Sequence, residues 1–147
     1  MISPEVIAAA QAAQRKWKVP ASVSLAQYGI ESAWGTKEPL NSNNPFGIQA
    51  LPDLPSVAAT SHEFRNGAMV PVVEHFAAFK DVAEAFDRHA QLLATLRAYR
   101  YAMANCENPD RFAECLTGVY ATAPHYGDIL VNLMKADNLY QYDVKGA

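Results

Sequence analysis

The chain has 147 residues, of which 50% are hydrophobic and 18% charged, with a formal net charge of −3. This length corresponds to one domain, and the apolar content excludes a disordered protein. The mildly acidic charge, without a Lys/Arg run, argues against nucleic acid or an anionic membrane surface as a partner. We expect a single, monomeric domain over residues 1–147.

The N-terminus gives no signal for secretion. Segment 1–14 lacks a basic start, and Glu5 and Gln11 interrupt its apolar run. No stretch approaches the ~20 apolar residues that cross a bilayer. We therefore expect no membrane association, and delivery to any substrate outside the cell would require phage lysis or another export route.

The first two predicted helices lie in the N-terminal quarter of the chain. Ser3 is a capping residue followed by proline, which suits the start of a helix. A second helix over about 20–34 would end at Gly35, which places Glu31 in its last turn, near the negative end of the helix dipole. The residues expected on its buried face are Val23, Ala26, Ile30 and Ala33.

The second half of the chain is also predicted to be helical. Asp81 and Glu84 resemble a capping box at the start of a helix whose apolar spacing extends to Tyr99. Further helices are expected after Asn108-Pro109 and after Pro124. The residues expected to point inward after Pro109 are Phe112, Cys115, Leu116 and Val119.

Residues 56–79 predict a small β-lobe beside this helical body. The Asn-Gly pair at 66–67 is the strongest short-range signal for a hairpin, and a two-residue turn there sets Glu63 opposite Val70. Pro71 cannot donate to a β-ladder, so its strand should lie at an edge or carry a bulge. The predicted fold class is therefore mainly α (α+β).

Several common kinds of functional site are missing from the sequence. The histidines and cysteines lack metal-ligand spacing, and neither a G-x-S-x-G elbow nor a phosphate-binding glycine loop occurs. His89, on an apolar helix face, is interpreted as a core histidine with satisfied hydrogen bonds. Cys106 and Cys115 are either bridged or two buried free thiols. We expect no metal and no cofactor.

Glu31 is the strongest candidate for chemistry. Burial beside Trp34 and the negative end of the helix would both raise the pKa of its carboxyl. A carboxylic acid that stays protonated near neutral pH is the proton donor that glycoside cleavage needs. The competing interpretation is an ordinary solvated glutamate on a helix.

Short motifs occur in a fixed order over roughly residues 20–143. They are ESAWG at 31–35, NNPFGI at 43–48, TSHEF at 60–64, FAAF at 76–79 and YATAPHY at 120–126. Their order, around the predicted hairpin, resembles the glucosaminidase family of peptidoglycan hydrolases, glycoside hydrolase family 73. That family includes flagellar rod-cap hydrolases, autolysins and phage lysins.

The resemblance implies a lysozyme-like fold with a cleft between the helical body and the β-lobe. It implies cleavage of the β-1,4 bond after N-acetylglucosamine in cell-wall peptidoglycan, with Glu31 as the general acid. Glu63 would be the second carboxylate, acting as base or electrostatic stabiliser, with Glu74 and then Asp81 as poorer choices. The residues that would bind substrate are Tyr120, Asn44 and Tyr126.

Alternatives remain open at the level of the sequence. A muramidase or a lytic transglycosylase of the same fold would use a similar acid, and a non-catalytic wall-binding or tail-assembly module would keep the fold without turnover. The reaction could invert configuration with carboxyls roughly 6.5–9.5 Å apart, or retain it at about 5–5.5 Å. The N-acetyl group of the substrate could also take part.

Overall fold

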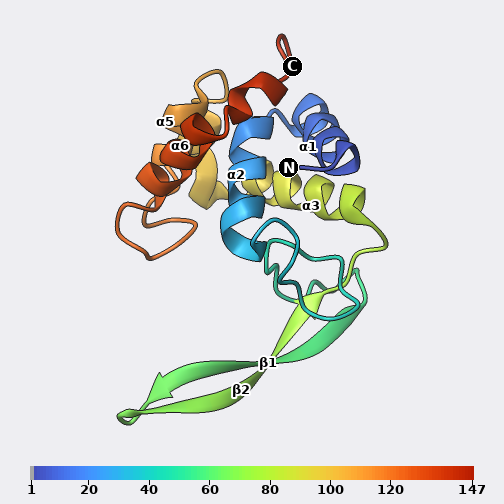
Figure 1. Ribbon diagram of the computed structural model, residues 1–147, viewed down its shortest axis with the longest axis vertical. Helices are drawn as coiled ribbons and strands as arrows, with labels where there is room; N and C mark the ends of the chain where they lie inside the picture. The colour runs from blue at the N-terminus through green and yellow to red at the C-terminus, as the bar shows by residue number, and fades with distance from the viewer. Residues whose placement is uncertain (1) are drawn as a thin grey trace.

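The structure, a computed structural model, describes residues 2–147 and has the predicted mainly α architecture with one antiparallel hairpin (Figure 1). Helix α2 (Ala21–Ser32) runs through the middle of the helical body and contacts α1, α3, α5, α6 and η2. Within residues 2–147, no helix combines the length and apolar character that crossing a bilayer requires. The remaining elements are α1 (Pro4–Trp17), β1 (Ser56–Arg65), β2 (Ala68–Ala77), α3 (Val82–Thr95), η1 (Arg97–Tyr99), α4 (Arg100–Met103), α5 (Pro109–Glu114), α6 (Tyr126–Ala136) and η2 (Leu139–Tyr142).

Burial along α2 differs from the one-sided face that its apolar spacing predicts. Residues 21–29 are buried on every side, because neighbouring helices surround this part of the helix. The helix reaches the surface only in its last turn, where Ile30 is 43% exposed and Glu31 is exposed. The prediction that Ile30 is buried is therefore wrong, and the same geometry brings Glu31 to solvent.

The N-terminus of α2 is satisfied by side chains from distant parts of the chain. Asp143 accepts hydrogen bonds of 2.8 Å from both the backbone N–H and the hydroxyl of Ser22. Gln14 Oε1 accepts from the N–H of Ala21 at 3.1 Å and from that of Val144 at 2.8 Å. A carboxylate at this end of a helix interacts favourably with the positive pole of the dipole, so these contacts join both ends of the chain to the central helix.

The predicted helix starts are confirmed at three caps. Ser3 accepts from Val6 N, Asp81 from Glu84 N and Asn108 from Arg111 N. The apolar spacing after residue 81 overestimates the length of α3. The helix ends at Thr95, and the chain then turns through η1 and α4.

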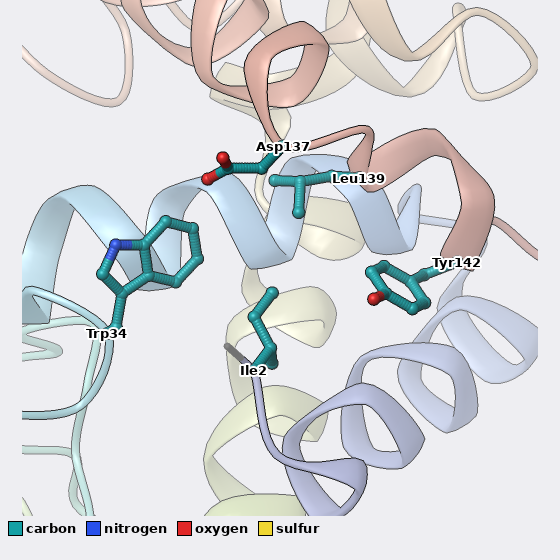
Figure 2. Close-up of a pocket in the computed structure, with 5 residues that line it drawn as sticks. All are labelled: Ile2, Trp34, Asp137, Leu139 and Tyr142. Atoms are coloured by element: carbon teal, nitrogen blue, oxygen red, sulfur yellow. The ribbon is translucent and has the colours of Figure 1, made fainter.

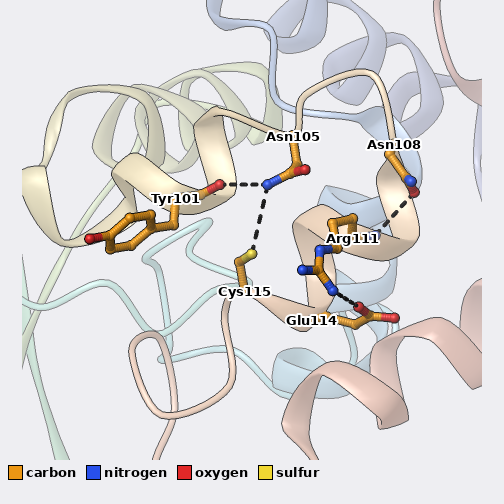
Figure 3. Close-up of polar contacts among 6 residues, drawn as sticks. All are labelled: Tyr101, Asn105, Asn108, Arg111, Glu114 and Cys115. Carbon is orange, nitrogen blue, oxygen red and sulfur yellow. Dashed lines mark hydrogen bonds and ion pairs between the residues drawn. The ribbon is translucent and has the colours of Figure 1, made fainter.

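The prediction that Val119 points into the core is wrong. Because α5 ends at Glu114, Val119 lies in the following loop and is 45% exposed. Figure 3 shows how side chains tie α4 to α5: Asn105 donates to the carbonyl of Tyr101 and, at 3.9 Å, to the sulfur of Cys115. In the described chain Cys106 and Cys115 are both free thiols, as the second alternative predicts, but each is half-buried and not buried.

The hairpin has the predicted turn and register. Asn66 and Gly67 both have positive φ, 50° and 81°, as a two-residue type I′ turn requires. Glu63 pairs with Val70, and Pro71 lies within β2 of the two-stranded sheet, where each strand has a free edge. The turn end of the hairpin projects away from the helical body (Figure 1).

Asn44 holds the 36–55 loop against the base of the hairpin. Its Nδ2 donates to the carbonyls of Ile48 and Ala77 at 2.8 and 2.9 Å. Its Oδ1 accepts from the backbone N–H groups of Phe46 and Ile48. The residue is 1% exposed, and its amide is fully engaged with the backbone. The expectation that Asn44 binds substrate is therefore corrected: a loop that packs on the core needs internal partners for its backbone groups.

Replacing Asn44 with alanine should lower the free energy of unfolding by about 2–4 kcal/mol, because buried backbone donors and acceptors lose their partners. Urea unfolding measures this loss. Asn43→Gly is the control, since Asn43 is exposed, its φ of 48° suits glycine, and its side chain makes one bond, to the Phe79 carbonyl at 2.9 Å. Equal losses in the two variants would contradict the role given to Asn44.

Candidate functional site

Glu31 lies at the point where α2 ends. Ser32 makes this end, because its hydroxyl donates to the Tyr28 carbonyl at 2.7 Å and accepts from Gly35 N at 2.9 Å. Three consecutive residues with positive φ, 33 to 35, then turn the chain away. The helix thus stops before the predicted Gly35, and Glu31 keeps its expected place in the last turn.

Tyr126, the first residue of α6, provides the direct partner of Glu31. Its hydroxyl donates to Glu31 Oε1 at 3.1 Å and accepts from Gln27 Nε2 at 3.1 Å. Gln27 is completely buried and Tyr126 is 3% exposed. The structure therefore joins two residues that are 95 positions apart and supports the carboxyl of Glu31 from the protein interior.

Close packing of α6 on α5 places Tyr126. A Cβ atom on Gly127 would lie 2.6 Å from the Ala113 carbonyl and 2.7 Å from Glu114 Cα, so only glycine permits this approach. The N–H of Gly127 also donates to Thr117 Oγ1 at 2.9 Å. These contacts fix the start of α6, and with it the phenol that faces Glu31.

The surroundings of Glu31 shift its ionisation in the direction that an acid catalyst needs. Partial desolvation raises the pKa of Glu31 above the ordinary value of 4.5, and the hydrogen bond from Tyr126 lowers it by less. Burial raises the pKa of Tyr126 as well, the hydrogen bond from Gln27 lowers it by less, and the nearby Glu31 raises it further. The pair is therefore a neutral phenol and a carboxyl that holds its proton more strongly than a solvated glutamate.

Aromatic rings continue inward from Tyr126. Tyr120 stacks on Tyr126 with ring centroids 5.7 Å apart and an angle of 10° between planes. His89 contacts Tyr120 edge-on at 6.0 Å and stacks on Phe46 at 4.0 Å. Burial is the main cause of a raised pKa at Tyr120. Tyr120 and Tyr126, predicted as substrate residues, thus lie together beside the candidate acid.

His89 differs from the satisfied core histidine that the sequence predicts. It is buried, but within residues 2–147 neither ring nitrogen has a hydrogen-bond partner. Desolvation lowers the pKa of His89 to about 3. The ring is therefore neutral in the folded protein at neutral pH.

Glu63 occupies a different setting from Glu31. It is exposed near the turn of the hairpin and forms an ion pair with Arg65 at 2.7 Å. Its cross-strand partner is Val70, and Glu74 lies on the same face of the hairpin, as the register requires. Asp81 is occupied as the cap of α3. A hydrogen bond joins Tyr126 to Glu31, whereas Glu63 pairs with Arg65 of its own strand.

Gln27 is the residue that reasoning from the sequence missed. The spacing of four residues between Gln27 and Glu31 places both on one face of a helix, which was a usable signal. A buried polar residue in an otherwise apolar helix was a second one. Neither signal identifies Tyr126 as the group between them, because that contact depends on how α6 packs.

A separate hollow of about 290 Å³ opens beside the last turn of α2, near Trp34 (Figure 2). Glu31, Glu63 and Tyr126 are not among its lining residues, so it is distinct from the candidate acid. Among residues 2–147, no group of three or more His, Cys, Asp or Glu side chains is placed to hold a metal ion. The side chains that line the hollow are Ile2, Trp34, Asp137, Leu139 and Tyr142.

Comparison with known proteins identifies the family. The sequence profile of the glucosaminidase family, described as mannosyl-glycoprotein endo-beta-N-acetylglucosaminidase, matches residues 7–139. The chain belongs to the glucosaminidase family. Because the match extends from α1 to η2, it includes the whole hairpin and every element that contributes to the Glu31 site.

Curated relatives of this glucosaminidase-family chain are longer proteins. An autolysin of Enterococcus faecalis is 36% identical over 132 residues, which are 84% of this chain and 18% of the relative. Peptidoglycan hydrolase FlgJ of Escherichia coli K12 is 31% identical, over 86% of this chain and 42% of the relative. The chain thus spans less than half the length of these two relatives.

Solved structures share the fold. The catalytic domain of the autolysin Auto from Listeria monocytogenes superposes with a TM-score of 0.83 at 26% identity, covering 95% of this chain and 84% of that one. A truncated glycoside hydrolase domain of Salmonella typhimurium FlgJ gives a TM-score of 0.76 at 27% identity, covering 90% and 93%. The predicted family and fold class are confirmed.

The buried neutral His89 should make stability fall in acid. The pKa of His89 in the folded protein, about 3, lies below the ordinary histidine value of 6.5, so between these values the unfolded chain binds a proton that the folded one does not. Its contribution is complete above pH 6.5 and is lost as the pH falls toward 3, by about 3 kcal/mol between pH 7 and 4.

Urea unfolding of His89→Leu at several pH values measures this contribution. The variant should lose about 3 kcal/mol less than the wild type between pH 7 and 4. His62→Gln is the control, since His62 is exposed on the hairpin. Parallel pH dependences for wild type and His89→Leu would contradict the assignment.

Proposed function

We propose that this chain hydrolyses cell-wall peptidoglycan at the β-1,4 bond after N-acetylglucosamine, with Glu31 as the general acid. Membership of the glucosaminidase family supports the reaction class. Relatives named autolysin, peptidoglycan hydrolase and, in Bacillus subtilis, exo-glucosaminidase LytG support the substrate. The observation that carries the role of Glu31 is its carboxyl at the exposed end of α2, hydrogen-bonded to buried Tyr126.

In the proposed reaction, Glu31 gives its proton to the glycosidic oxygen as the bond to the sugar carbon breaks. Positive charge develops at that carbon, and water supplies the hydroxyl that completes hydrolysis. A raised pKa keeps the donor protonated at higher pH than a solvated glutamate would be. Half-buried Tyr120 would form the wall of the site beside the reacting sugar, whereas buried Tyr126, predicted as a substrate residue, would support the carboxyl of Glu31 from the interior.

Glu63 is proposed as the second carboxylate, on the face of the hairpin that also carries Glu74. It would activate the water or stabilise the charge on the sugar once a glycan strand lies between hairpin and helical body. The carboxyl of Glu63 lies near the hairpin turn and pairs with Arg65 at 2.7 Å. The turn end of the hairpin projects away from the helical body, which favours a second mechanism. In that mechanism the substrate's own N-acetyl group would assist the reaction, and Glu31 would be the one essential carboxylate.

The site of action proposed for the chain is the cell wall, reached by phage lysis or another export route, and the proposed form is a monomer. The proposed roles of Glu31 as general acid and Glu63 as second carboxylate need no metal ion. Analysis of the products would distinguish three other activities: a muramidase, a lytic transglycosylase and a binding module without turnover.

Replacing Glu31 with glutamine should reduce digestion of purified peptidoglycan by ~100-fold or more, because the proton donor is lost. Thermal unfolding should show an intact or slightly stabilised fold, since a carboxyl at the negative end of a helix is unfavourable. In the wild type, activity should fall as the pH rises through the raised pKa of Glu31. Near-normal activity in Glu31→Gln would contradict the proposal.

The products identify the bond. Borohydride reduction and mass spectrometry should reveal new reducing ends on N-acetylglucosamine and no 1,6-anhydro ends. Reduced N-acetylmuramic acid would indicate a muramidase, anhydro ends a transglycosylase, and no products a binding module.

Glu63→Gln tests the two routes. With Glu63 as base or stabiliser, the variant should lose at least about 10-fold in activity, whereas Glu74→Gln on the same hairpin face should lose much less. Full activity in Glu63→Gln, together with an inactive Glu31→Gln, would support assistance by the substrate's N-acetyl group instead.

A further inference from the structure

The hydrogen bonds behind Glu31 run in one direction. Gln27 Nε2 donates to Tyr126 Oη, and Tyr126 Oη donates to Glu31 Oε1. A phenol has a single proton. Because Gln27 occupies a lone pair of the phenol oxygen, the phenol proton is directed toward Glu31.

We propose that Gln27 is a positioning residue that acts through Tyr126: it makes Glu31 Oε1 an obligatory acceptor and so places the transferable proton of Glu31 on Oε2. This inference rests on the proposed role of Glu31 as general acid. It adds which oxygen delivers the proton and which buried residue decides that choice.

The burial of Gln27 supports this direction. The residue is 0% exposed, and within residues 2–147 its Oε1 has no hydrogen-bond partner. A carbonyl oxygen left without a partner in the core costs folding free energy. The amide oxygen of Gln27 therefore makes no hydrogen bond, while its Nε2 donates to Tyr126. This is expected of a residue that serves function and not packing.

The opposite orientation of the amide would put two acceptors on one phenol. Gln27 Oε1 would then take the phenol proton, and Glu31 could bond the phenol only as a protonated donor. Only the observed direction gives the ionised form of Glu31, which can only accept, a hydrogen bond from Tyr126. The titratable groups that sense the charge of Glu31 are Tyr126 from α6 and Tyr120 from the preceding loop, both with raised pKa.

This arrangement favours the transition state over the resting acid. As Oε2 gives its proton to the glycosidic oxygen and the bond to the sugar carbon breaks, Glu31 becomes a carboxylate. Water adds its hydroxyl to the sugar carbon and releases one proton to solution, and Glu31 is protonated again. The bond from Tyr126 becomes charge-assisted in this step and hence stronger, and a bond that strengthens along the reaction lowers the barrier.

The test is the pH profile of peptidoglycan digestion in Gln27→Met, which keeps the length of the side chain and removes the donor. We expect a loss of about 10-fold at the optimum and a shift of the alkaline limb to higher pH by about half a unit or more. The carboxylate of Glu31 is then less stabilised and its pKa rises.

Ser24→Ala is the matched control. Ser24 lies one turn earlier on α2, is buried, and its hydroxyl has no partner among residues 2–147. The pH profile of this variant should equal that of the wild type.

A double-variant cycle shows whether Gln27 acts through Tyr126. Tyr126→Phe should shift the limb in the same direction and by at least as much as Gln27→Met, and adding Gln27→Met to Tyr126→Phe should cause little further loss. Equal, independent losses from both substitutions would overturn the proposal. If Gln27→Met is not recovered folded, Gln27→Leu, which also removes the donor and adds no charge, should give the same shift.

A measurement without substrate separates this inference from the proposed function. The carboxyl ¹³C titration of Glu31, assigned by its disappearance in Glu31→Gln, should move to higher pH in Gln27→Met. A moved titration with an active Glu31→Gln variant would overturn the general acid and with it the proton delivery proposed here. An unmoved titration with an inactive Glu31→Gln would overturn the positioning role of Gln27 and leave the proposed function intact.

Discussion

The burial of α2 on every side is the constraint on which the rest of this structure depends. A helix can be surrounded in this way when its side chains are small or apolar and when its polar ends find internal partners. The N-terminal end is satisfied by Asp143 and Gln14, from opposite ends of the chain. The C-terminal end is closed by Ser32, and it is there that the helix reaches solvent and presents Glu31.

Polar groups inside this core mark the part of the molecule that is not optimised for stability. The buried atoms without a partner among residues 2–147 come from Ser24, Gln27 and His89. Two of these residues lie on α2 and the third on α3. Gln27 bonds the phenol that supports Glu31, and His89 contacts the ring that stacks on that phenol. Natural proteins tolerate such local conflicts mainly at functional sites.

The two candidate carboxyls differ in how firmly the fold supports them. Glu31 is tied to α6 by Tyr126, whose position is set by the close contact of Gly127 with α5. Glu63 belongs to a two-stranded hairpin, and a hairpin of two strands has little packing of its own. The body of the protein therefore holds the candidate acid in place, while the position of Glu63, the proposed second carboxylate, is set by the hairpin.

The sequence by itself determined the local features, because their causes lie within a few residues. Ser3, Asp81 and Asn108 cap helices through bonds to N–H groups three positions ahead, and the Asn-Gly turn sets the register of the hairpin. The order of short motifs also identified the family. Only the tertiary structure decided features whose partners are distant in the chain. Examples are the exposure of Ile30, the use of Asn44 to hold a loop, and the contact of Gln27 with Glu31 through Tyr126. Packing between elements controls burial and long-range hydrogen bonds. Helical periodicity carries no information about which neighbour covers each face of a helix.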